Sequence, residues 1–148
     1  MARTRVYLDV CCLNRPFDDQ AQPRIRLESE AVLLILKAVE IGVFDLVTSD
    51  AVYVELSRHP RPDERGCIQQ VLQSARERVE FSATTDDRAR ELNALGFAPL
   101  DALHVSFAET AAADALCTTD DGLLRLAQRH RHRLRVRVVN PVTWLEET

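Results

Sequence analysis

The stretch Arg5–Val10, which reads RVYLDV, is a short run of apolar and β-branched residues that ends close to Asp9. Such a run predicts a buried strand. Farther along, Ile25–Ile41 places apolar residues at helical spacing, and Gly42 ends that pattern. The segment Phe44–Thr48 (FDLVT) then predicts a second strand. A strand, a crossover helix and another strand together favour a parallel sheet.

The same alternation continues to the end of the chain. Three more strands are predicted, at Val79–Phe81, Ala115–Thr119 and Arg135–Val139. One further predicted helix carries Glu55 and is capped by Ser49 or Asp50. The others run from Asp63 to about Arg76, from Thr85 or Asp86 to about Leu95, from Pro99 to about Ala113 and from Asp121 to His130, and a final helical turn begins at Pro141. We therefore expect an α/β fold, a three-layer α/β/α arrangement with a mainly parallel four- to five-stranded sheet, in a single domain spanning residues 1–148.

One polar segment separates the first strand from the first helix. Its turn-forming and charged residues predict a long loop; they are Asn14, Pro16, Asp18, Asp19 and Pro23.

Composition and charge limit the function without deciding it. The chain has 148 residues, of which 46% are hydrophobic and 28% charged, as in an ordinary folded domain. The net charge of −4 excludes a function that rests on overall basicity. Arg131, Arg133, Arg135 and Arg137 alternate, however, and on an extended segment they would share one side. Such a row predicts either phosphate contacts or an edge strand protected by charge, and the sequence does not separate the two.

The cysteines and the apolar stretches indicate a cytoplasmic protein that does not span a membrane. The four cysteines show no CxxC spacing, so we expect reduced thiols, mostly buried; they are Cys11, Cys12, Cys67 and Cys117. The longest apolar stretch, Ala31–Phe44, contains Lys37 and Glu40 and is too short and too charged for a bilayer span.

Four acidic residues follow the predicted strands in a way that suggests one site. Asp9 ends the first strand, Glu55 lies on the helix after the second, and Asp120 follows the fourth, while Asp101 begins the helix that leads into the fourth. The carboxyl ends of parallel strands meet at one edge of a sheet, where ligands bind. Each acid alone is an ordinary cap or first-turn residue. Together, carboxylates suit Mg²⁺ or Mn²⁺, and such a metal supports phosphodiester hydrolysis.

The motifs around these acids resemble those of the PIN domain family, which includes the VapC-like toxins of bacterial toxin–antitoxin systems. The resemblance lies in the order and spacing of YLDVCCLNRP (7–16), TSDAVYVEL (48–56), PLDALHVSFA (99–108), LCTTDDGLL (116–124) and VVNPVTWLEE (138–147). It implies a metal-dependent endoribonuclease in which Asp9, Glu55, Asp101 and Asp120 are the catalytic and metal-binding residues, with Thr118 as a supporting hydroxyl. It also implies RNA as substrate, Mg²⁺ or Mn²⁺ as cofactor, a cognate antitoxin as partner and a homodimer.

Two departures from the family pattern leave other functions open. Cys11 stands where the family often has Asn or Ser, and the NRPFDD segment (14–19) is longer than in many toxins, so that Asn14, Arg15 and Asp18 can reach the site. The alternative is a catalytically weak or inactive PIN-fold module that binds RNA or protein. A phosphoacceptor of the response-regulator type is disfavoured, because no lysine follows the last strand.

Two further residues have open roles. Asp121 either assists Asp120 or caps the following helix, and His104 either contacts substrate or is a structural residue.

Overall fold

The computed structural model describes residues 2–148 and contains one sheet of five strands in the order β3-β2-β1-β4-β5. The strands are β1 (Thr4–Leu8), β2 (Phe44–Ser49), β3 (Glu77–Val79), β4 (Ala115–Cys117) and β5 (Arg137–Val139). All the pairings are parallel, and the central strand β1 pairs with both β2 and β4. The predicted α/β class and five-stranded parallel sheet are confirmed.

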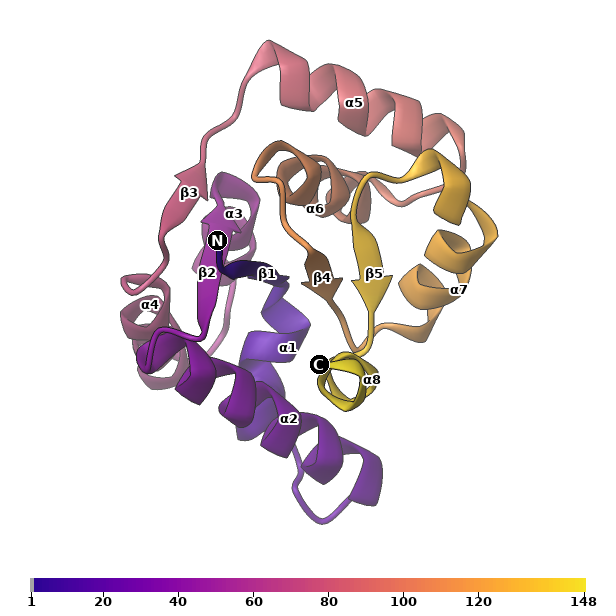
Figure 1. Ribbon diagram of the computed structural model, residues 1–148. Helices are drawn as coiled ribbons and strands as arrows, with labels where there is room; N and C mark the ends of the chain where they lie inside the picture. Colours follow the sequence, from indigo (N-terminus) through magenta and orange to yellow (C-terminus); the bar gives the residue numbers. More distant parts are fainter. Residues whose placement is uncertain (1) are drawn as a thin grey trace.

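Helices cover both faces of the sheet (Figure 1). They are α1 (Val10–Asn14), α2 (Pro23–Glu40), α3 (Asp50–Ser57), α4 (Pro62–Leu72), α5 (Ala83–Ala94), α6 (Pro99–Thr110), α7 (Asp121–Arg129) and α8 (Pro141–Glu147). Two short 3₁₀ turns, η1 (Arg15–Phe17) and η2 (Arg131–Arg133), complete the chain. Helices α2 and α8 pack on one face, whereas α6 packs on the other with α5 outside it. This is the three-layer arrangement expected from the sequence.

Local sequence signals set several of the boundaries. The Ser49 side chain accepts a hydrogen bond from the Val52 backbone N–H and starts α3, as expected for a serine N-cap. Gly42 and Gly96 have φ values of 82° and 109°, in the left-handed region, and each follows the end of a helix. The stop predicted at Gly42 is therefore confirmed, and Gly96 follows the end of α5 in the same conformation.

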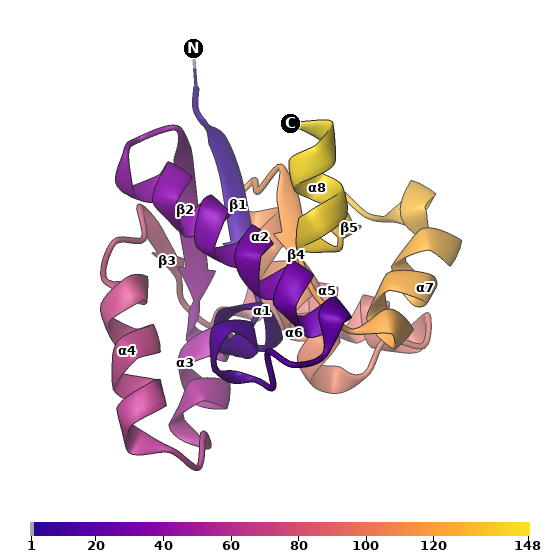
Figure 2. The same ribbon diagram turned by 90° about the horizontal axis from the view of Figure 1, so that it is seen from below.

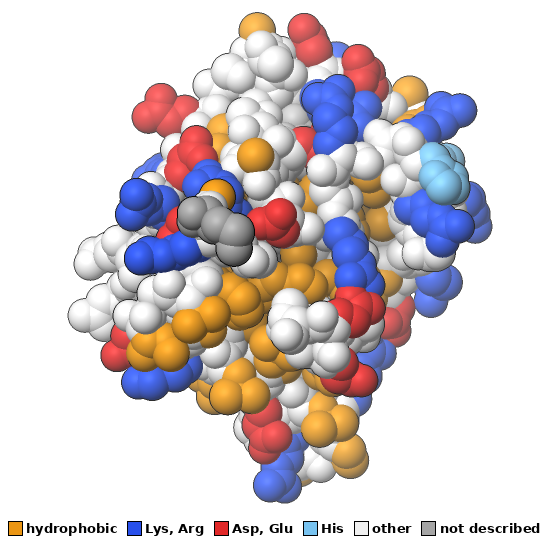
Figure 3. Space-filling view, viewed as in Figure 1, with side chains coloured by type: hydrophobic (Ala, Val, Ile, Leu, Met, Phe, Trp, Pro, Cys, Tyr) orange, Lys and Arg blue, Asp and Glu red, His pale blue; other side chains and the backbone are white. Residues whose placement is uncertain are grey.

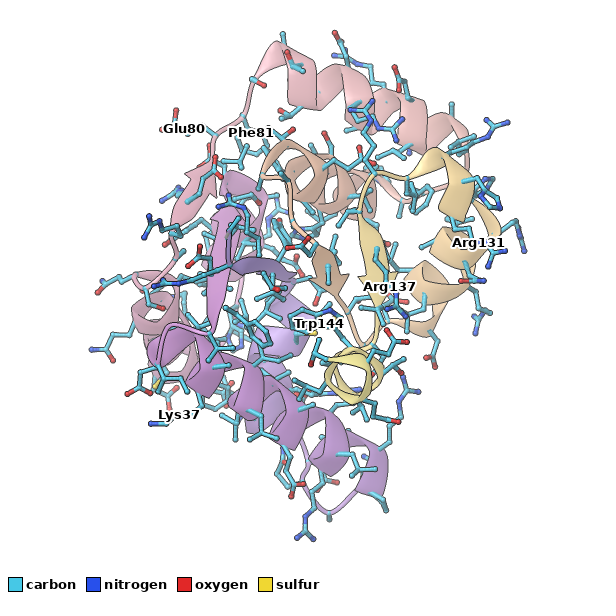
Figure 4. All side chains as sticks on the ribbon, viewed as in Figure 1. Lys37, Glu80, Phe81, Arg131, Arg137 and Trp144 are labelled. Atoms are coloured by element: carbon cyan, nitrogen blue, oxygen red, sulfur yellow. The ribbon has the colours of Figure 1, made fainter. Side chains whose placement is uncertain are left out.

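The core fills the space between the sheet and its helices. Tyr7, Phe97 and Phe107 are among the largest fully buried side chains. The Trp144 ring on α8 packs against Phe44 with a centroid separation of 4.8 Å, and Figure 4 shows Trp144 on the side of α8 that faces the sheet. Trp144 is therefore a packing residue of the core.

Several predicted boundaries were wrong. The polar segment after β1 is not a continuous loop but forms α1 and η1, because Asp9 caps a short helix there. Helix α4 begins at Pro62 rather than at an Asp63 cap, since proline is well suited to the first helical position. Helix α5 is capped by Ser82 rather than Thr85, which instead completes a capping box.

The arginine row is also not an extended segment. Arg131 and Arg133 lie in η2, and only Arg137 lies in β5, so these side chains do not share one side of a strand. Figure 4 shows Arg131 and Arg137 on separate elements. Strand β5 does lie at an edge of the sheet.

No disulfide joins the four cysteines within the described residues, and their burial varies. Cys12 and Cys117 are buried, Cys11 is half-buried and Cys67 is exposed. Within residues 2–148, no helix has both the length and the apolar character that crossing a bilayer requires.

Candidate active site

The parallel sheet directs four separate segments toward one rim. Figure 2 shows β1 running directly into α1, so Asp9 lies at the carboxyl end of the central strand. Glu55 lies on α3, which follows β2 directly, and Asp120 lies between β4 and α7. Asp101 lies in the first turn of α6. All four candidate acids are therefore on the carboxyl side of the strands.

Asp9 is the most deeply buried of these acids, with 6% of its surface exposed. Its Oδ1 accepts hydrogen bonds from the Cys12 backbone N–H at 3.1 Å and from the Cys11 thiol at 2.8 Å. Burial raises the pKa of Asp9, and the Cys11 sulfur raises it further, whereas the Thr118 hydroxyl and His104 act in the opposite direction. Charging Asp9 therefore costs free energy unless a cation lies nearby.

Asp120 caps α7 in the same way that Asp9 caps α1. Its Oδ1 accepts from the backbone N–H groups of Gly122 at 2.8 Å and Leu123 at 3.2 Å. Thr118 Oγ1 in turn accepts from the Asp120 N–H at 3.2 Å. Within the described residues, neither Asp9 nor Asp120 uses Oδ2 to accept a backbone hydrogen bond. Each cap therefore orients its carboxylate through Oδ1.

The pKa of Asp101 links it to the other acids. Burial raises this pKa, Asp120 and Glu55 add to the rise through charge repulsion, and His104 opposes it. Repulsion of this kind acts over short distances, so Asp101, Asp120 and Glu55 share one electrostatic environment. These three predicted residues therefore lie on the same side of the sheet, close enough for Asp120 and Glu55 to act on the charge of Asp101.

A buried hydrogen-bonded chain holds Glu55. His104 Nε2 lies 2.8 Å from Glu55 Oε1, and its Nδ1 lies 2.7 Å from the Tyr7 hydroxyl. A carboxylate only accepts hydrogen bonds, so Nε2 carries the proton and Nδ1 accepts from Tyr7. The Ser49 hydroxyl lies 2.6 Å from the Tyr7 oxygen and completes the chain as its donor. Burial raises the pKa of Tyr7, which keeps it a donor.

The sequence left the role of His104 open between substrate contact and structure, and it did not predict this hydrogen-bonded chain. His104 is buried and orients Glu55 rather than facing open solvent. The one local signal was its spacing of three residues from Asp101, which puts both on the same side of α6. Tyr7 carried no signal, because its partners lie 42 and 97 residues away.

Comparison with known proteins assigns the chain to a family. The model of the PIN domain matches residues 6–129, which include all four acids. The chain belongs to the PIN domain family. No curated protein sequence matches it.

A solved structure has the same fold as this PIN domain. It is VapBC2 from Rickettsia felis bound to a DNA fragment from its promoter, to one chain of which this protein is 16% identical. The alignment covers 93% of this chain and 98% of that chain, with a TM-score of 0.55. At this identity the likeness shows the shared fold, and PIN domains are generally nucleases.

The donor atoms of this PIN domain suit a hydrated hard cation. Within residues 2–148, no three of the four carboxylates bring their oxygens within 4.8 Å of one another; the three-residue group that does so is Asp9, Cys11 and Cys12. Mg²⁺ keeps several of its waters and uses one or two carboxylates directly, so wider spacing still fits it. Thiols favour softer metals, but Cys12 is fully buried. The acids therefore fit Mg²⁺ or Mn²⁺.

A second polar cluster, centred on Glu28, joins α2 to η1 and to the segment before α8. Glu28 on α2 is 2% exposed and accepts hydrogen bonds from Arg15 Nε at 2.9 Å, Arg24 Nε at 3.2 Å and Asn140 Nδ2 at 2.6 Å. Both guanidinium groups are thereby fixed between α2 and the segments around them. The sequence offered no signal for Glu28, because Asn140 lies 112 residues away.

Arg24 connects this cluster to the segment that carries Asp120. It donates two hydrogen bonds of 2.8 Å to Asp121 and one of 3.1 Å to the Thr119 carbonyl. The Arg24 guanidinium lowers the pKa of Asp121. The role of Asp121 is therefore to pair with this arginine, while Asp120 is the N-cap of α7. The interpretation of Asp121 as the N-cap was wrong by one residue.

Proposed function

We propose that this PIN domain is a divalent-metal-dependent endoribonuclease that hydrolyses RNA phosphodiester bonds. The observation that carries the proposal is the placement of Asp9, Glu55, Asp101 and Asp120 on the carboxyl side of one parallel sheet, with burial raising the pKa of Asp9 and Asp101. Buried acids that resist charging favour a bound cation, because the cation offsets their mutual repulsion.

In this proposal the four acids hold Mg²⁺ or Mn²⁺ and the remaining groups orient them. A divalent metal held by these acids would activate a water molecule as the nucleophile and would polarise the scissile phosphate. Asp9 and Asp120 are fixed by the helix N-termini that they cap, and Glu55 is fixed by His104. Thr118 supports Asp120 through its N–H. Preorganised groups of this kind avoid reorganisation at the moment of reaction.

RNA cleavage by the purified protein tests this function. We expect single-stranded RNA to be cut with Mg²⁺ or Mn²⁺ and to remain intact when a chelator removes the metal. The second candidate is a PIN-fold module that binds RNA or protein and cuts weakly or not at all, which the Cys11 thiol against Asp9 favours. Intact RNA with either metal, from protein with a folded circular dichroism spectrum, would support this second candidate.

Replacement of His104 by Ala is expected to lower cleavage by about 10- to 100-fold, because groups that orient a metal ligand contribute on this scale. Glu55 would lose its donor at 2.8 Å. The measurement is the cleavage rate against Mn²⁺ concentration, normalised to the folded fraction, and the half-saturating Mn²⁺ concentration should rise. His132→Ala, which alters an exposed histidine, serves as the control. An unchanged half-saturating Mn²⁺ concentration in His104→Ala would mean that His104 contributes only to core packing.

The proposal includes a protein partner and a cytoplasmic location. The solved VapBC2 structure supports a cognate antitoxin, as the toxin–antitoxin resemblance implies, and a homodimer follows from the same resemblance. Figure 3 shows apolar side chains gathered near α2. Leu27 and Leu34 on α2 and Ile41 just after it are exposed. Patches of this kind favour protein contacts. Growth arrest on expression, relieved by a small protein from the neighbouring gene, is the expected result.

A further inference from the structure

A hollow of about 550 Å³ opens beside the candidate active site, between η1 on one side and α3 and the start of α4 on the other. Cys11 and Glu55 line it, so the hollow adjoins the edge of the sheet that carries the four acids, which we call the acidic rim. Its volume falls within the range that small-molecule sites occupy. A larger hollow, of about 700 Å³, is lined by parts of α7, β5 and α8 and includes none of the four acids.

The wall of the smaller hollow is a fixed polar network. The Arg61 backbone N–H donates to His59 Nδ1 at 3.1 Å, so the proton of His59 lies on Nε2, which donates to Asn14 Oδ1 at 2.7 Å. Asn14 Nδ2 then donates to Asp18 Oδ1 at 3.0 Å, and Arg15 pairs with the other oxygen of Asp18 at 3.1 Å. These side chains are already ordered, so a ligand would bind without first immobilising them.

Two groups at this hollow are available to a ligand. Phe17 is 39% exposed although it is a large aromatic residue, and it lies on η1. Arg58 is exposed, and within the described residues it forms no ion pair, whereas Arg61 pairs with Glu64. An exposed aromatic face stacks on nucleobases, and an unpaired guanidinium binds phosphate.

We propose that this hollow seats one unpaired RNA base next to the scissile phosphate, with Phe17 as its stacking face and Arg58 on the adjoining phosphate. The inference rests on the proposed ribonuclease function and adds a specificity subsite to it. Asn14, Phe17 and Asp18 line the hollow, and all three belong to the NRPFDD segment, which builds one wall of the subsite. A single strand fits this arrangement, because a base within a duplex cannot leave its stack without a cost.

The test pairs a protein variant with a modified RNA. Short RNAs carry an abasic nucleotide at each of the two positions that flank the cut. For the wild type, one of these RNAs should be cleaved about fivefold to about 150-fold more slowly, which corresponds to about 1–3 kcal/mol for one stacked base. Phe17→Leu keeps an apolar side chain but has no aromatic face. It should cleave intact RNA more slowly by a similar factor and show no further loss with the abasic RNA.

Two control variants isolate the stacking contribution. Phe17→Trp should retain the wild-type rate and the sensitivity to the abasic position. Phe81→Leu changes another exposed phenylalanine, which follows β3 and does not line the hollow, and it should behave as the wild type. Equal cleavage of intact and abasic RNAs by the wild type, or a Phe17→Leu variant as fast as the wild type, would overturn the subsite.

A binding measurement separates failure of the subsite from failure of the ribonuclease proposal. RNA with 2-aminopurine at the sensitive position, or at each position in turn if the protein cuts no RNA, is titrated with wild-type protein in the presence of a chelator. Quenching that disappears in Phe17→Leu supports the subsite whether or not the protein cleaves. Absence of quenching at every position overturns it, even if cleavage is observed.

Discussion

Asp9→Asn is expected to reduce RNA cleavage by about 10³-fold or more while the protein stays folded. The metal contributes several kcal/mol of transition-state stabilisation, and each 1.36 kcal/mol is a factor of about ten in rate. Asparagine keeps the shape and remains a good N-cap, so the hydrogen bond from the Cys12 N–H that starts α1 is retained. What the variant loses is the charge at the centre of the sheet.

The stability of the same variant tests the cause. Because burial raises the pKa of Asp9, the folded metal-free protein binds this proton more tightly than the unfolded chain does. The stability contributed by Asp9 is therefore fully present at low pH and decreases as the pH rises from about 4 through the raised pKa. Asp9→Asn lacks this decrease, so without metal its melting temperature at neutral pH should equal or exceed that of the wild type. Urea or thermal melts at several pH values measure this.

Added metal should reverse the order of the two melting temperatures and make the wild type more stable than Asp9→Asn. A ligand that binds only the folded state stabilises it by about 2.7 kcal/mol at one hundred times its dissociation constant. Mn²⁺ should therefore raise the melting temperature of the wild type and have little effect on Asp9→Asn. A variant that unfolds, with a loss of cleavage that only follows the unfolded fraction, would make Asp9 a structural residue.

Glu28→Ala is expected to destabilise the protein by about 2–3 kcal/mol, because it removes a buried acceptor and leaves the Asn140 amide and one donor of each arginine without a partner. The Glu28 carboxylate is 2% exposed and contacts Arg15 and Arg24. For a chain of this size the loss corresponds to roughly 6–10 °C in melting temperature. Cleavage should fall as well, since Arg24 also holds Asp121 and the Thr119 carbonyl beside Asp120.

A matched variant on the same helix controls for the loss of an acid. Glu30 pairs with Arg26 at 3.6 Å, but its side chain is 60% exposed, so Glu30→Ala should change the free energy of unfolding by no more than about 0.5 kcal/mol. Denaturant unfolding with comparison of the m-values measures both variants. Equal effects of the two substitutions would show that the buried network contributes nothing beyond a surface ion pair.

The sequence allowed the sheet and the position of the four acids to be predicted because both follow local patterns. Apolar runs and helical periodicity mark the strands and helices, and parallel connection places every residue that ends a strand at the same edge. Asp9 and Asp120 could be located in this way. The helix α1 was missed because five residues are too few for periodicity to appear.

The supporting groups could not be predicted, because their partners are distant in the sequence. Tyr7 meets His104 across 97 residues, and Arg24 meets Asp121 across the same separation. Hydrogen bonds of this kind depend on the packed fold and leave no pattern in a short window. The spacing of the carboxylates was likewise beyond sequence reasoning, since it depends on the orientation of each side chain.

The rate of RNA cleavage as a function of Mn²⁺ concentration, compared between the wild type, Asp9→Asn and Asp87→Asn, tests the central claim most directly. Asp87 is an exposed acid on α5 that pairs with Arg90, so its replacement removes a charge away from the rim. We predict saturable, Mn²⁺-dependent cleavage by the wild type and Asp87→Asn and none by Asp9→Asn. Mn²⁺-dependent cleavage by Asp9→Asn at the wild-type rate would contradict the assignment of the acidic rim as the catalytic metal site.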